Sequence, residues 1–68
     1  MALLMSQSDI RNAVKDCLAR CYAGTTPLGE IAEFVAELRD TGWKEEDIRA
    51  VETTVRRVLA GVLDVDDA

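Results

Sequence analysis

Apolar residues recur every three or four positions along three stretches of the chain, a period typical of amphipathic α-helices. The pattern is interrupted near Gly24 and again at Gly42. It predicts helices over about residues 7–23, 27–41 and 44–63. The apolar stripes expected to face one another are Ile10, Val14, Cys17, Leu18 and Cys21; Leu28, Ile31, Phe34, Val35 and Leu38; and Ile48, Val51, Val55, Val58, Leu59 and Val62.

The residues at the predicted helix ends support these boundaries. Ser6 and Asp9 have the spacing of a capping box, in which each side chain accepts a hydrogen bond from the backbone of the other. Thr26 and Pro27 form a typical helix start, with threonine as the N-cap and proline in the first turn. We expect Gly24 to end the first helix in the left-handed conformation, which glycine adopts without a Cβ clash.

Gly42 is expected to end the second helix in the same way. Trp43 follows it, where a Schellman motif would bring it to Leu38 and where it also precedes Ile48 of the third helix. We therefore expect Trp43 to fill the core between the second and third helices.

Both predicted connections are about three residues long, which makes neighbouring helices antiparallel. A chain of 68 residues forms one domain. The sequence thus predicts an all-α fold, a small up-down-up three-helix bundle comprising residues 1–68. Fraying is expected at the termini, since acids in the tail from Asp64 onward are unfavourable at a helix C-terminus.

Composition places the protein among soluble globular domains, with 49% hydrophobic and 31% charged residues. No stretch approaches the roughly 20 apolar residues of a membrane span. The short apolar start lacks the basic residues and cleavage site of a secretory signal. We expect a cytoplasmic protein without membrane contact.

The absence of histidine excludes Ser/His/Asp and Cys/His catalysis and removes the commonest metal ligand. We expect no enzymatic activity, no cofactor and no metal site. The net charge of −5 would repel phosphate, as would Glu45, Glu46 and Asp47 at the start of the third helix. Nucleic acid is therefore not an expected partner.

Cys17 and Cys21 lie four residues apart on the apolar stripe of the first helix. They are interpreted as small core residues. A redox pair or half of a metal site shared by a dimer is the alternative.

Charged residues on the helices form two kinds of pattern. Oppositely charged residues four apart predict ion pairs within the helices, and these are Asp16–Arg20, Glu45–Arg49 and Glu52–Arg56. Four acids on one face of the second helix are expected to have no neutralising partner in the chain. This acidic stripe comprises Glu30, Glu33, Glu37 and Asp40.

Apolar residues are in excess at the two ends of the chain, where Leu3 and Leu4 precede the first helix and Val62 and Leu63 close the third. In an up-down-up bundle these ends lie apart, but an antiparallel two-fold dimer would bring them together. The leading hypothesis is a small non-enzymatic protein-interaction module that self-associates as a homodimer and acts as an adaptor or accessory subunit. The alternative is an acidic inhibitor whose stripe enters the basic groove of a nucleic-acid enzyme.

Overall fold

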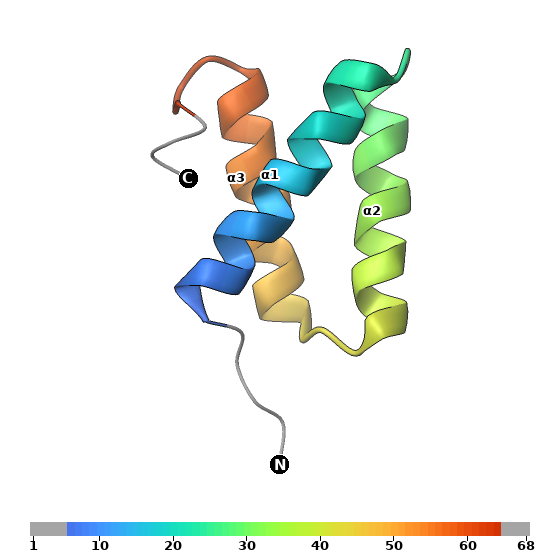
Figure 1. Cartoon of the computed structure of the whole chain (residues 1–68), viewed down its shortest axis with the longest axis vertical. Helices are drawn as coiled ribbons and strands as arrows, with labels where there is room; N and C mark the ends of the chain where they lie inside the picture. The colour runs from blue at the N-terminus through green and yellow to red at the C-terminus, as the bar shows by residue number, and fades with distance from the viewer. Residues whose placement is uncertain (1–5, 65–68) are drawn as a thin grey trace.

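Three helices form where the apolar period predicts them. In the computed structural model, which describes residues 6–64, α1 spans Gln7–Ala23, α2 spans Pro27–Thr41 and α3 spans Glu45–Leu59. The helices run up, down and up again, so the start of α1 and the end of α3 lie at opposite ends of the bundle (Figure 1). The predicted all-α, up-down-up three-helix bundle is confirmed.

The start of α1 has the predicted capping box. The Asp9 N–H donates to Oγ of Ser6 at 3.1 Å, and the Ser6 N–H donates to Oδ2 of Asp9 at 3.3 Å. The expectation that Gly24 adopts the left-handed conformation is wrong, because this residue is extended, with φ −89° and ψ 171°. Glycine is needed there for space instead, since a Cβ would lie only 2.9 Å from Cγ of Glu30 on α2.

The start of α2 differs from the prediction in one respect. Pro27 occupies the first turn, but the Thr26 side chain makes no capping hydrogen bond. Its methyl group faces the first turn at Gly29, and the backbone carbonyl of Thr26 accepts the Glu30 N–H at 3.0 Å. Thr26 is therefore the N-cap residue, as predicted, but the helix begins through backbone bonding, and the expected capping hydrogen bond of the threonine side chain is absent.

The end of α2 is the predicted Schellman motif. Gly42 is left-handed, with φ 100°, and its N–H donates to the carbonyl of Arg39. The Trp43 N–H donates to the carbonyl of Leu38 at 3.0 Å. This turn directs Trp43 back toward α1.

α3 ends at Leu59, four residues before the predicted end. Gly61 is left-handed, with φ 81°, and the Val62 N–H donates to the carbonyl of Arg57 at 2.9 Å. This is a second Schellman motif. The apolar period continues in sequence to Val62 although the helix does not, which is why periodicity alone extended α3 too far.

The core contains side chains from all three helices. Phe34 and Val55 both point inward, with exposures of 6% and 0%. Leu28 was expected in the stripe of α2 but is 66% exposed, because it lies in the first turn of that helix, at the end of the bundle. The buried apolar residues are Ala13, Val14, Cys17, Leu18, Cys21, Ile31, Phe34, Leu38, Ile48, Val51 and Val55.

Candidate functional site

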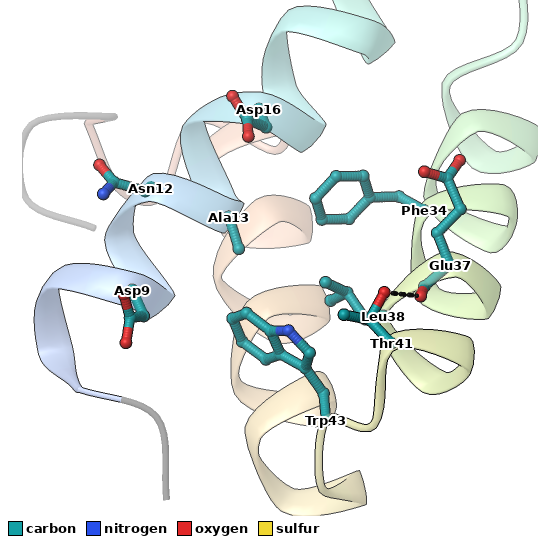
Figure 2. A pocket seen from close by; sticks show the side chains of 9 residues that line it. All are labelled: Asp9, Asn12, Ala13, Asp16, Phe34, Glu37, Leu38, Thr41 and Trp43. Carbon is teal, nitrogen blue, oxygen red and sulfur yellow. Dashed lines mark hydrogen bonds between the residues drawn. The ribbon is translucent and has the colours of Figure 1, made fainter.

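An open groove of about 460 Å³ lies between the first half of α1 and the second half of α2. The two helices are joined at the top of Figure 1 and separate toward the start of α1 and the end of α2. Figure 2 shows the side chains that line it, with the ring of Phe34 and the indole of Trp43 directed toward α1. The lining residues are Asp9, Asn12, Ala13 and Asp16 of α1; Phe34, Glu37, Leu38 and Thr41 of α2; and Trp43.

Trp43 contributes an apolar surface to this α1–α2 groove. It packs against the core, as predicted, but remains half-buried and leaves part of its indole on the groove. Phe34 and Leu38, which are only 6% and 7% exposed, line the groove beside it, so Trp43 is the most exposed part of its apolar floor. The sequence analysis placed Trp43 only between α2 and α3. The period of apolar residues along each helix does not predict that α1 and α2 separate.

The rim of the groove carries carboxylates from both helices. Asp9 and Asp16 are exposed on α1, and Glu37 is exposed on α2. Asp9 is part of the capping box, which orients its side chain. Among the described lining residues none is basic.

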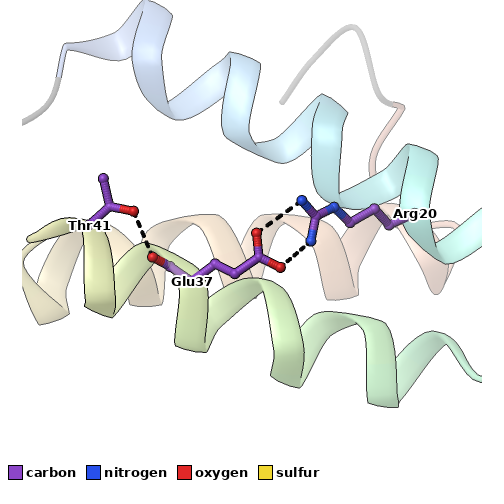
Figure 3. A network of polar contacts seen from close by, with 3 residues as sticks. All are labelled: Arg20, Glu37 and Thr41. Atoms are coloured by element: carbon purple, nitrogen blue, oxygen red, sulfur yellow. Dashed lines mark hydrogen bonds and ion pairs between the residues drawn. The ribbon is translucent and has the colours of Figure 1, made fainter.

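Glu37 is bound by Arg20 from the neighbouring helix (Figure 3). Arg20 donates from Nη1 to Oε2 and from Nη2 to Oε1, the second bond being 3.0 Å long. This hydrogen bonding lowers the pKa of Glu37 and raises that of Arg20. The guanidinium carbon of Arg20 also lies 5.0 Å from the centre of the Phe34 ring, within the range of a cation–π contact.

One carboxylate of the acidic stripe therefore has an ion-pair partner within the chain. The expectation that none of the four charges is neutralised is wrong for Glu37. Arg20 was expected to pair with Asp16 within α1, but it pairs across the interface because α2 brings a carboxylate within reach of both its nitrogens. Glu33 and Asp40 are exposed, whereas Glu30 is half-buried beside Gly24.

A second cross-helix pair also replaces a predicted one. Glu45 was expected to pair with Arg49, but Arg39 donates to it at 2.5 and 3.0 Å across the α2–α3 turn. Hydrogen bonding by Arg39 lowers the pKa of Glu45. The predicted pair Glu52–Arg56 is confirmed, with a separation of 3.1 Å.

Among residues 6–64, the large apolar side chains that remain exposed share one end of the bundle. Tyr22 ends α1, Leu28 begins α2 and Val62 follows α3, and they are 68%, 66% and 70% exposed. All three segments lie at the upper end in Figure 1. We call this surface the apolar end. Leu63 beside it is half-buried.

Leu3 and Leu4, the other half of the predicted dimer surface, lie outside the described residues.

Both cysteines are free and buried, so their predicted place in the core is confirmed. Burial, followed by the neighbouring Cys21, raises the pKa of Cys17 to about 12. The thiol of Cys21 donates to the carbonyl of Pro27 at 3.7 Å.

Three further observations bear on function. Within residues 6–64, no group of three histidine, cysteine or acidic side chains is placed to hold a metal ion. No helix in that range combines the length and apolarity needed to cross a bilayer. Asp47, which we assigned only to the first turn of α3, is buried, and no pattern in the sequence had indicated this.

Comparison with known proteins adds no identification. No family model, no curated protein and no solved structure matches the chain.

Proposed function

We propose that this chain is a small, cytoplasmic, non-enzymatic protein-interaction module that pairs with a second copy of itself through the apolar end. The observation that carries the proposal is the exposure of Tyr22, Leu28 and Val62 at one end of the bundle. Fully burying a side chain such as leucine or valine contributes about 1.5–3 kcal/mol, so covering these three side chains in an interface would offset part of the entropic cost of association. Such a dimer would serve as an adaptor or accessory subunit.

An antiparallel two-fold arrangement suits the topology. The start of α1 lies at the opposite end of the bundle from the apolar end, so the residues preceding α1 are attached far from Val62 of the same chain. In a second copy turned end for end, Leu3 and Leu4 would approach Val62 and Leu63. Each copy would then contribute the same two surfaces.

The alternative, an acidic inhibitor that enters a basic groove of a partner enzyme, has less support. Glu37, at the centre of the acidic stripe, already binds Arg20. A basic partner would have to compete with that pair, and only Glu33 and Asp40 of the stripe are exposed without an ion pair among residues 6–64.

Light scattering coupled to size-exclusion chromatography tests the proposal. Across loading concentrations from about 1 to 200 μM, the mass is expected to rise from 7.5 kDa to twice that value, because association depends on concentration. Val62→Asp places a charge on the apolar end and should shift the rise to higher concentration. A mass of 7.5 kDa throughout would refute self-association.

Thr53→Asp is the matched control, because Thr53 is exposed on α3 away from the apolar end. It adds the same charge and should leave the dimer unchanged. Equal effects of Thr53→Asp and Val62→Asp would show that overall charge, and not the apolar end, governs association. Far-UV circular dichroism of both variants serves to check that they keep the helical fold.

A further inference from the structure

The α1–α2 groove combines an apolar floor with an acidic wall, and neither feature belongs to the proposed dimer surface. The floor is formed by Phe34, Leu38 and Trp43, and the wall by Asp9 and Asp16 of α1. A ligand that fits must therefore carry apolar and cationic groups together. A small soluble amine would pair only with the carboxylates of the wall. An uncharged apolar molecule would contact only the apolar floor.

The spacing along α1 defines the shape of that ligand. Asp9 and Asp16 are seven residues apart, which places them on one face of the helix and about 10.5 Å apart along its axis. Asn12 and Ala13 lie between them on the same face. A partner helix lying along α1 would fit this spacing if it carried two basic residues seven positions apart. Its apolar residues would stand three and four positions after the first of those basic residues.

The negative charge on the α1 side of the groove is available to a partner. Asp16 is exposed and makes no ion pair among residues 6–64. Arg20, the nearest base along α1 on the C-terminal side, is held by Glu37 and stacked over Phe34. It therefore pairs with a carboxylate of α2 and leaves Asp16 without an ion pair among residues 6–64. The net charge of −5 further favours the approach of a cationic segment.

From these observations we infer that the α1–α2 groove binds a basic amphipathic helix of a partner protein. The apolar residues of that helix contact Trp43 and the exposed edges of Phe34 and Leu38, and its basic residues pair with Asp9 and Asp16. The bound segment becomes a fourth helix of the bundle, in the manner of other helix-in-groove interactions. This surface is distinct from the apolar end.

Trp43 provides the readout, because it is the one tryptophan of the chain and lines the groove. The probe is a capped peptide of about 18 leucine and lysine residues, long enough to form a helix, with leucine at helical spacing. Adding it to the full chain should shift the Trp43 emission to shorter wavelength in a saturable manner. A peptide with glutamate in place of every lysine should produce no such shift.

Asp16→Lys and Asp40→Lys separate a specific site from general attraction between opposite charges. Both change the net charge equally, but Asp16 lines the groove and Asp40, also exposed, does not. Asp16→Lys should weaken peptide binding at least about tenfold, and Asp40→Lys by less than about twofold, because only the first places a charge beside the bound helix. Circular dichroism of both variants serves to check that they are folded.

Several results would overturn the inference. The first is the absence of a saturable change in Trp43 emission. The second is equal weakening of peptide binding in the two lysine variants. The third is binding of the glutamate peptide as tight as that of the lysine peptide. A shift of Trp43 emission with protein concentration alone would place a second copy in the groove and would also overturn it. Binding is expected to persist in Val62→Asp, so failure of the dimer and failure of the groove are distinguishable.

Discussion

Arg20 of α1 donates two hydrogen bonds to the carboxylate of Glu37 of α2, and so connects the last turn of one helix to the second half of the next. The same guanidinium stacks on Phe34, whose ring forms part of the core and of the groove floor. One side chain thus joins the charge of Glu37 to the packing of Phe34.

The Arg20–Glu37 pair should make stability depend on pH. Because the folded pKa of Glu37 lies below the ordinary value of 4.5, its stabilisation is complete above that value and is lost as the pH falls through the folded pKa. Glu37→Gln is expected to lower the urea midpoint modestly at neutral pH, since both partners are about half exposed. The difference from wild type should shrink as the pH falls below 4.5.

Glu33→Gln is the control for that prediction. Glu33 is exposed one turn away on α2 and forms no ion pair among residues 6–64. It should change the urea midpoint less than Glu37→Gln at neutral pH. A Glu37→Gln deficit that grows on acidification would contradict the proposed linkage.

Replacing glycine by alanine should have opposite effects at two positions near α2. Gly42 has φ 100°, and a Cβ there would meet no atom within 4 Å, so Gly42→Ala encounters backbone strain alone and should destabilise by about 1 kcal/mol. Gly29 is helical, and a Cβ there would make ordinary contact with Thr26 at 3.5 Å. Gly29→Ala should therefore stabilise by up to about 1 kcal/mol. Urea unfolding followed by circular dichroism measures both, and changes of the same sign would be inconsistent with these backbone assignments.

The two thiols should be inert in the folded protein. Cys17 and Cys21 are 1% and 3% exposed, and the pKa of Cys17 is raised to about 12, so the reactive thiolate is scarce at neutral pH. Reaction with a disulfide reagent should be more than about a hundredfold slower than for an unfolded thiol. Both should react at once in denaturing urea. Rapid modification of either cysteine without urea would show that α1 opens readily.

The helices could be predicted from the sequence because their determinants are local. The period of three and four places each stripe on one face, and the Ser6 capping box and the Schellman turn at Gly42 act within a few residues of the chain. The predicted end of α3 was wrong for a local reason too. Gly61 has the same left-handed role as Gly42, but the apolar Val62 that follows continued the period and concealed it.

The pairing of charges could not be predicted in this way. Spacing within one helix selected Asp16 for Arg20 and Arg49 for Glu45, whereas the folded chain offers Glu37 and Arg39. Contacts between helices bring together residues far apart in sequence, and a helical period contains no information about them. The proposed dimer surface and its partner remain predictions, and Leu3 and Leu4 lie outside the described residues.

The sequence by itself determined three amphipathic helices, their order and most of the core, because propensity, capping and apolar period are properties of neighbouring residues. Only the tertiary structure decided that α1 and α2 separate around Trp43, that Arg20 binds Glu37, and that Tyr22, Leu28 and Val62 share one exposed end. These features depend on the angle and distance at which helices pack. The packing is set by side-chain shapes acting across the bundle, and the linear pattern of apolar and polar residues does not encode it.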